Sequence, residues 1–124
     1  MTTDPINIFQ SEYLNTWTEP NPGSRRAAIE RVWKPDGRMV VSSAGITLRG
    51  IDDIAAHIGQ VHDDLIAGKG LTFTYDQHIQ AGEALLLRWS MLTPAGETVG
   101  RGADVVFRDS GGHIETVYMF MGVN

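Results

Sequence analysis

The fold of this chain is decided by the segment Gly100-Arg-Gly-Ala-Asp104-Val-Val-Phe107-Arg-Asp-Ser-Gly-Gly112-His-Ile-Glu-Thr-Val-Tyr-Met-Phe-Met121. Two runs rich in β-branched and aromatic residues flank the cluster Asp109–Gly112, whose glycines can adopt the positive φ angles of tight hairpins. The pattern predicts an antiparallel hairpin. Its first strand contains one carboxylate, Asp104, a residue type that is disfavoured in strands and costly to bury. Asp104 therefore either faces water or lies in a cavity for a functional reason.

Further β-rich runs and turns precede this hairpin. Strands are predicted at 71–80, 84–93, 98–107 and 113–121, and short turns between them indicate an antiparallel meander. Upstream, apolar spacing predicts a helix that is capped by Asp4-Pro5 and broken by Glu19–Gly23, then helices at about 24–33 and 51–67. Lys34–Gly37 is expected to end the second helix. Two short strands, 38–42 and 46–49, are expected around a Ser-Ser-Ala-Gly turn.

Helices first and strands afterwards indicate an α+β fold. We expect one domain over residues 1–124, with three N-terminal helices packed in the concavity of a strongly curved antiparallel sheet, a cone-shaped α+β barrel. The runs Leu85–Leu87 and Val105–Phe107 are apolar at successive positions, so both faces of their strands are predicted to be covered. Three helices cover one face only. The other face is predicted to pack against a second copy of the chain, which makes a homodimer.

Composition excludes several classes of function. The chain has 124 residues, 42% of them hydrophobic, and a net charge of −5. The negative charge and the lack of a basic run argue against nucleic acid or an anionic membrane as partner. The absence of cysteine excludes disulfides, thiol nucleophiles and thiolate metal sites. The sequence shows neither a signal peptide nor an apolar run of about 20 residues, so we expect a cytoplasmic protein.

Motifs along nearly the whole chain resemble a known group of proteins. They are Tyr13-x-x-x-Trp17, Val32-Trp33-x-Pro35-Asp36-Gly37, Gly50 before the third helix, Arg88-Trp89, and Gly102-x-Asp104 followed by Asp109-x-x-Gly112-x-Ile114. In this order and spacing they resemble the nuclear transport factor two-like superfamily, nearer its SnoaL-like and ketosteroid isomerase-like branches. The superfamily contains isomerases, cyclases, hydrolases, dehydratases and many non-enzymes, so the resemblance implies a fold more than an activity.

The resemblance also implies roles for particular residues. Ketosteroid isomerases use a tyrosine of the first helix and a protonated aspartic acid of the penultimate strand as an oxyanion hole, and Tyr13 and Asp104 fall on those positions. Their catalytic base is an aspartate of the first strand, where this sequence has Val41. SnoaL-like cyclases use an aspartate near the Asp104 position as acid or base. Limonene epoxide hydrolases use two aspartates and an arginine, which Arg88 and Asp104 match only in part.

The hairpin register decides whether Arg88 or Trp89 faces the pocket. A two-residue turn at Ala95-Gly96 sets Trp89 opposite Gly102 and Leu87 opposite Asp104, all facing inward, whereas a slip of one residue turns Arg88 inward instead. We favour the first register because a bulky indole packs well against glycine. The predicted lining of the pocket is Tyr13, Trp17, Trp33, His57, Leu87, Trp89, Met91, Asp104, Val106, Val117 and Met119.

Histidine spacing does not indicate a metal site. His57 and His62 are five residues apart and do not share a helix face. His57 borders the apolar stripe of its helix, one turn from Asp53, which could orient the ring as a base. A half-buried surface histidine is the other reading. His62, His78 and His113 are interpreted as surface positions, and the pairs Arg25-Arg26 and Asp63-Asp64 as solvated helix faces.

The sequence therefore supports two hypotheses. In the first, the chain is an isomerase or cyclase without cofactor or metal that acts on a hydrophobic carbonyl or polyketide-like molecule. Tyr13 and Asp104 would stabilise or protonate the oxygen, and His57 would be the base. In the second, the chain is a non-catalytic module that binds a small hydrophobic molecule or only dimerises. The missing carboxylate at Val41 favours the second hypothesis, and the pair Tyr13 and Asp104 favours the first.

Overall fold

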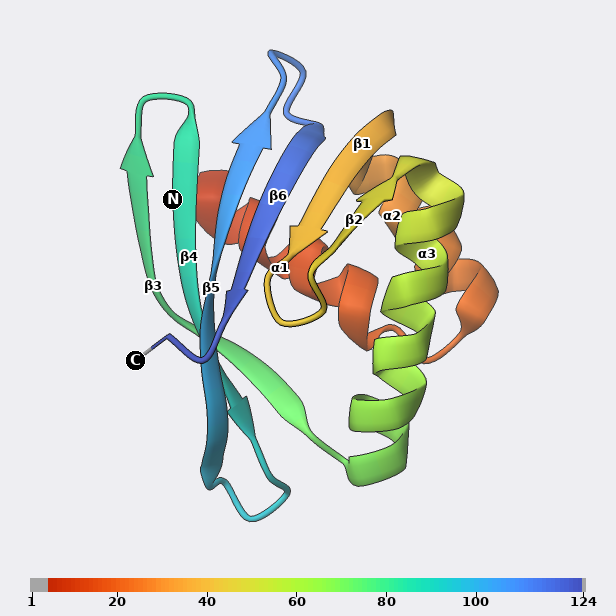
Figure 1. Cartoon of the computed structure of the whole chain (residues 1–124), viewed down its shortest axis with the longest axis vertical. Coiled ribbons are helices and arrows are strands. Elements are labelled where there is room, and N and C mark those ends of the chain that lie inside the picture. Colours follow the sequence, from red (N-terminus) through yellow and green to blue (C-terminus); the bar gives the residue numbers. More distant parts are fainter. Residues whose placement is uncertain (1–4, 124) are drawn as a thin grey trace.

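The computed structural model describes residues 5–123. Its helices and strands follow in the order α1 (Pro5–Thr18), α2 (Pro22–Val32), β1 (Trp33–Val41), β2 (Ile46–Arg49), α3 (Gly50–Val61), η1 (His62–Ala67), β3 (Thr72–Ala81), β4 (Ala84–Leu92), β5 (Thr98–Arg108) and β6 (Ile114–Met121). Figure 1 shows the helices on one side of a bent sheet, with α1 crossing behind the strands and α3 running along one flank. The expected α+β fold with N-terminal helices is confirmed.

Six strands form one sheet in the order β2-β1-β6-β5-β4-β3. The meander from β3 to β6 is antiparallel, as expected, and so is the β1–β2 hairpin. Two details differ from the expectation. β1 pairs with β6 in parallel, and β2 and β3 stand at opposite ends of the sheet, so the sheet is an open cone rather than a closed barrel.

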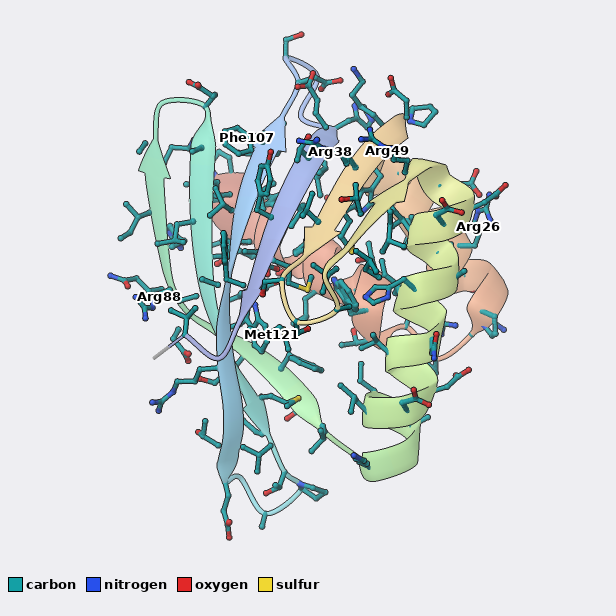
Figure 2. All side chains as sticks on the ribbon, viewed as in Figure 1. Arg26, Arg38, Arg49, Arg88, Phe107 and Met121 are labelled. Carbon is teal, nitrogen blue, oxygen red and sulfur yellow. The ribbon has the colours of Figure 1, made fainter. Side chains whose placement is uncertain are left out.

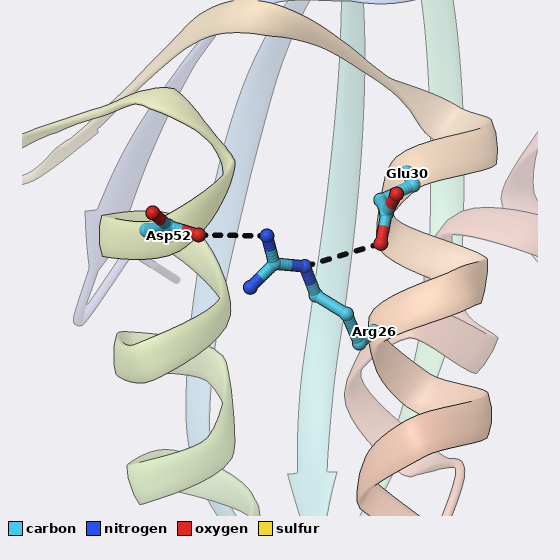
Figure 3. Close-up of polar contacts among 3 residues, drawn as sticks. All are labelled: Arg26, Glu30 and Asp52. Atoms are coloured by element: carbon cyan, nitrogen blue, oxygen red, sulfur yellow. Dashed lines mark hydrogen bonds and ion pairs between the residues drawn. The ribbon is translucent and has the colours of Figure 1, made fainter.

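The first two helices begin where the local chemistry predicts. Pro5 opens α1. Proline has no backbone N–H, and at the first position of a helix that group would have no partner within the helix. Asp4, the expected cap, lies outside the described residues. Asn21 caps α2, and its side-chain oxygen accepts a hydrogen bond of 2.9 Å from the Ser24 amide. Arg26 then links two helices (Figure 3). It contacts Glu30 on α2 at 3.2 Å and Asp52 on α3 at 2.7 Å.

The end of α2 differs from the prediction. The sequence predicts a helix to Trp33, a break at Lys34–Gly37 and a strand that starts at Arg38. Instead α2 ends at Val32, and Trp33 already begins β1. The pairing of β1 with β6 shifts register between Trp33 and Arg38. Proline is tolerated in a strand at such an irregularity, so the Pro-Asp-Gly segment bends β1 without ending it.

The third helix also differs from its prediction. The expected single helix over 51–67 is an α-helix to Val61 followed by a π-helical segment, His62–Ala67. His62, interpreted as a surface residue, is buried, and its Nδ1 lies 2.8 Å from the Trp17 carbonyl oxygen. Arg25, interpreted as part of a solvated face, is buried too, and its Nη1 donates a hydrogen bond of 2.9 Å to the Glu19 carbonyl oxygen. Both polar side chains satisfy main-chain carbonyls at the end of α1.

The favoured β4–β5 register is confirmed. Trp89 lies opposite Gly102 and Leu87 opposite Asp104. Trp89 is on the concave face with the helices, and Arg88 therefore belongs to the outer face; Figure 2 shows Arg88 pointing away from α3. Glycine is required at 102, because a Cβ there would lie 2.3 Å from Cζ2 of the Trp89 ring. The indole thus covers the backbone of the neighbouring strand.

The hydrophobic core fills the concave side between the helices and the sheet. It includes Phe9, Tyr13, Ile29, Ile54 and Ile58 from the helices, packed against inward-facing strand residues. The outer face carries an apolar row that crosses the sheet. Pairing places Val40, Tyr118, Val105, Leu86 and Ile79 side by side in that order. Within residues 5–123, none of the helices has the length and apolar character that a membrane span requires.

Candidate functional site

A cavity of about 240 Å³ opens on the concave side of the sheet. Its lining is mostly aromatic, aliphatic or thioether, and its ionisable members are His57, Tyr75 and Asp104. The full lining is Leu14, Trp17, Val41, Ser43, Ala44, His57, Val61, Leu65, Phe73, Tyr75, Trp89, Met91, Asp104, Met119 and Met121. An apolar cavity with a few convergent polar groups is the usual form of a small-molecule site.

The structure separates the predicted lining residues into two groups. Those that do line the cavity are Trp17, His57, Trp89, Met91, Asp104 and Met119. The others, Tyr13, Trp33, Leu87, Val106 and Val117, are buried in the core and do not line the cavity. Their side chains are part of the hydrophobic core cluster. The expectation that these five line the pocket is therefore corrected.

Asp104 is the centre of the polar chemistry. The residue is 3% exposed. Oδ1 accepts a hydrogen bond of 3.0 Å from Trp89 Nε1, and Oδ2 accepts one of 3.2 Å from the Tyr13 hydroxyl. Both donors come from positions that are distant in the chain, on β4 and α1. Two neutral donors therefore hold the carboxyl group at the cavity wall.

Burial raises the pKa of Asp104 from 3.8 to about 7, because the charged form is poorly solvated there. The hydrogen bonds from Trp89 and Tyr13 favour the carboxylate and oppose this rise. The direction is the one expected for a carboxyl group enclosed by apolar residues. At neutral pH the group is therefore divided between acid and carboxylate, which is the condition for proton transfer in either direction.

Tyr13 contacts the acid rather than the open cavity. It is fully buried, its ring stacks on Phe9 with centroids 5.8 Å apart, and its hydroxyl donates to Asp104. The pKa of Tyr13 is raised well above its usual value, first by burial and then by the charge of Asp104. Tyr13 remains a neutral donor across the physiological range. Its geometry fits a role in holding the Asp104 carboxyl in place.

His57 extends from α3 into the same cavity. It is half-buried, and its ring meets Trp17 edge-on with centroids 6.3 Å apart. Burial lowers the pKa of His57 below 6.5, so the ring is neutral at pH 7. Asp53, considered as its orienting partner, is exposed on the outside of the helix.

Three further positions complete the site. Val41 lines the cavity from β1, so an apolar side chain occupies the place that the resemblance assigns to a base. Phe73 and Tyr75 on β3 line it as well and were not predicted. Alternation from Leu71 onward, combined with the inward placement of Trp89, could have identified both. Among residues 5–123, no group of three or more acidic or histidine side chains could hold a metal ion.

Comparison with solved structures reveals the same architecture. A "putative isomerase of the SnoaL-like family" from Agrobacterium tumefaciens superimposes with a TM-score of 0.81 at 25% identity, over 93% of this chain and 95% of that one. A "putative SnoaL-like polyketide cyclase" from Jannaschia sp. gives 0.70 at 13% identity, over 98% and 90% of the two chains. A protein with a ketosteroid isomerase-like fold from Catenulispora acidiphila, in complex with trimethylamine, gives 0.69 at 18%, over 95% and 86%.

These similarities confirm the resemblance expected from the sequence. The chain has the cone-shaped α+β fold of SnoaL-like, nuclear transport factor two-like and ketosteroid isomerase-like proteins. No protein-family model and no curated protein matches the sequence itself. Function therefore has to be argued from the cavity and its ionisable groups.

Proposed function

We propose that the chain is a cofactor-independent enzyme that catalyses enolisation of a hydrophobic carbonyl compound, as an isomerase or cyclase requires. The observation that carries the proposal is a buried carboxyl group, Asp104, in the wall of an apolar cavity with a pKa of about 7. The names of the structural neighbours, an isomerase and polyketide cyclases, agree with this class of chemistry.

Asp104 and His57 have the properties of an acid and a base. Burial moves their pKa values in opposite directions, so at neutral pH the carboxyl group retains protons while the imidazole is neutral. In the proposed reaction, protonated Asp104 donates its proton to the carbonyl oxygen. His57 takes a proton from the adjacent carbon, and the electrons of that C–H bond form the enol double bond. His57 then returns its proton to a different carbon, the enol hydroxyl returns its proton to Asp104, and the carbonyl double bond re-forms, which completes an isomerisation.

A second candidate is a binding protein of the same fold. Val41 is the observation that favours it, because the position that the resemblance assigns to a base carries no ionisable group. The cavity of about 240 Å³ is slightly below the ~300–1,000 Å³ of typical ligand pockets and fits a compact molecule in either case. A ligand that binds without undergoing proton exchange would support this candidate.

Exchange of carbon-bound hydrogen tests the enzymatic proposal without a known substrate. We expect the protein to accelerate deuterium incorporation beside the carbonyl of β-tetralone, a compact bicyclic ketone, followed by proton NMR in deuterated buffer. The rate should fall above about pH 7, where Asp104 loses its proton, and also at low pH, where His57 is protonated. Asp104→Asn should reduce the rate by about 10²-fold or more and remove the alkaline limb.

His57→Gln provides the matched comparison. It should slow exchange and remove the acid limb while leaving the alkaline limb near pH 7. Variants that bind β-tetralone as tightly as the wild type does, but incorporate deuterium into it slowly, would support the assignment of acid and base. Binding without any accelerated exchange in the wild type would contradict the enzymatic proposal and favour the binding protein.

A homodimer through the outer face of the sheet is also proposed, because five apolar side chains form a continuous row there. Obligate interfaces bury roughly 2,000 Å² or more. Sedimentation velocity at micromolar concentration should give twice the monomer mass. Val105→Glu, in the middle of the row, should yield monomers, whereas Thr98→Glu, exposed at the start of the same strand, should not. A stable wild-type monomer would contradict the proposal.

A further inference from the structure

Tyr75 places a phenol in the cavity wall together with Asp104. It lines the cavity from β3, whereas Tyr13 is enclosed by the core. We propose that Tyr75 and protonated Asp104 together bind the oxygen atom of the ligand, and that Tyr13 is a positioning residue for the Asp104 carboxyl group. This inference rests on the proposed function and transfers to Tyr75 the direct contact that the resemblance implied for Tyr13.

Strand pairing places Tyr75 opposite the indole that donates a hydrogen bond to the acid. In the β3–β4 register Tyr75 lies directly opposite Trp89, whose Nε1 donates to Asp104. Phe73, two residues earlier on β3, meets the Trp89 ring edge-on with centroids 5.7 Å apart. Tyr75 and Asp104 both line the same cavity. The phenol and the carboxyl group therefore belong to one polar site.

A β-bulge immediately after Tyr75 holds this arrangement. The register of β3 shifts between Tyr75 and Gln77, and Asp76 is the extra residue. The Asp76 carboxylate accepts a hydrogen bond of 2.5 Å from the hydroxyl of Ser90, which is itself buried. Bulges are frequent beside binding sites, where they re-aim a side chain. The Asp76–Ser90 contact thus anchors the bend that follows Tyr75.

The protonation state of Tyr75 suits a donor. Its pKa is raised well above 10, first by burial and then by the charge of Asp104, so it keeps its proton throughout the physiological range. The hydroxyl can therefore donate to a ligand oxygen whose negative charge increases as an enol or enolate forms. The Tyr13 hydroxyl is directed at Asp104 Oδ2.

The walls of the site limit the ligand class further. The rings of Trp17, Phe73 and Trp89 surround the polar groups, and methionines complete the lining. Flat aromatic surfaces favour flat ligands, and methionine side chains adapt to irregular edges. The site is suited to a planar apolar enol or phenol that accepts two hydrogen bonds through one oxygen.

A pair of probes that differ by one hydroxyl tests this inference. Binding of β-naphthol and of naphthalene to the wild-type protein is measured by fluorescence at about pH 6, where Asp104 is protonated. We expect β-naphthol to bind more tightly. Tyr75→Phe should weaken β-naphthol binding by about 5- to 10-fold, the effect of one hydrogen bond, and change naphthalene binding by less than about 2-fold.

Tyr13→Phe is the contrasting variant. It should keep the preference for β-naphthol at this pH. It should also raise the pKa of Asp104, measured by carbon NMR titration, because the hydrogen bond from Tyr13 stabilises the carboxylate in the wild type and is absent in the variant. A preference that survives Tyr75→Phe, or disappears in Tyr13→Phe, would overturn the inference. Failure of the wild type to bind either probe would overturn both proposals. If Tyr75→Phe loses the preference for β-naphthol over naphthalene, but the wild type does not accelerate deuterium exchange of β-tetralone, the enzymatic function alone would be contradicted.

Discussion

Asp104→Asn is expected to make the protein more stable than the wild type at neutral and alkaline pH. The pKa of Asp104 is 3.8 in an ordinary environment and about 7 in the folded protein. The folded state therefore holds its proton to higher pH than the unfolded chain does. The stability of the wild type consequently falls as pH rises from about 3.8 to about 7, and the loss persists above that range. The shift corresponds to about 4 kcal/mol of unfolding free energy.

Asparagine removes this titration while keeping the shape of the side chain. Its carbonyl oxygen can accept from Trp89 Nε1, and its amide can donate to the Tyr13 oxygen, which rotates to accept. The difference between variant and wild type should be small near pH 4 and grow to a few kcal/mol at pH 8. Urea denaturation at several pH values measures it.

The opposite result would assign Asp104 a structural role. If Asp104→Asn destabilises the protein at pH 8, and the wild type loses stability on acidification through pH 4, the folded state stabilises the carboxylate. Asp109→Asn is the control, because that partly exposed carboxylate accepts hydrogen bonds from the amides of Gly111 and His113, which lower its pKa. This substitution should destabilise the protein at neutral pH and have less effect in acid.

Gly102→Ala is expected to be strongly destabilising. The added methyl group would lie 2.3 Å from Cζ2 of Trp89 and 2.6 Å from the Phe120 carbonyl oxygen, neither of which belongs to a flexible chain end. Overpacking of this kind costs about 1–3 kcal/mol. Displacement of the indole also loses its hydrogen bond to Asp104, which contributes about 1.5–3 kcal/mol where the acceptor is charged. Chemical denaturation should show a loss of about 3 kcal/mol or more.

Two further variants separate the clash from general effects of alanine. Gly59→Ala, on α3, places its methyl group in ordinary contact, 3.5 Å from Arg25 Nη2. It should be neutral or stabilising by up to about 1 kcal/mol, because alanine favours helices. Combined with Trp89→Phe, Gly102→Ala should cost less than it does alone. An unchanged stability in the single variant would contradict the packing of Trp89 over the β5 backbone.

Local chemistry determined which segments are helices and strands. The helix break at Glu19–Gly23 and the glycine turns between strands lie within a few residues of the observed ends of the elements. The β4–β5 register was predictable because one large-to-small pair, Trp89 and Gly102, favours a single alignment. The expected two-residue turn at Ala95-Gly96 was wrong: the turn spans residues 94–96, and a register shift between Met91 and Leu92 compensates for its extra length. Register in turn decides side-chain direction by alternation. The burial of Asp104 could therefore be predicted from the sequence.

Tertiary packing decided which side chains reach the cavity. Tyr13 and Asp104 are 91 residues apart, and the rotation of α1 that turns the hydroxyl towards the acid depends on all its contacts, including the stack on Phe9. Alternation along β3 gives the face of Tyr75, but that Tyr75 and Asp104, two strands apart, line one cavity depends on the packing of the whole sheet. The same holds for the parallel β1–β6 pair, which brings Val41 to the cavity. The sequence by itself determined the elements, the β4–β5 register and the buried acid, because these follow from local conformational preferences and alternation. Only the tertiary structure decided which groups surround the acid, because those contacts join segments whose relative position no local rule sets.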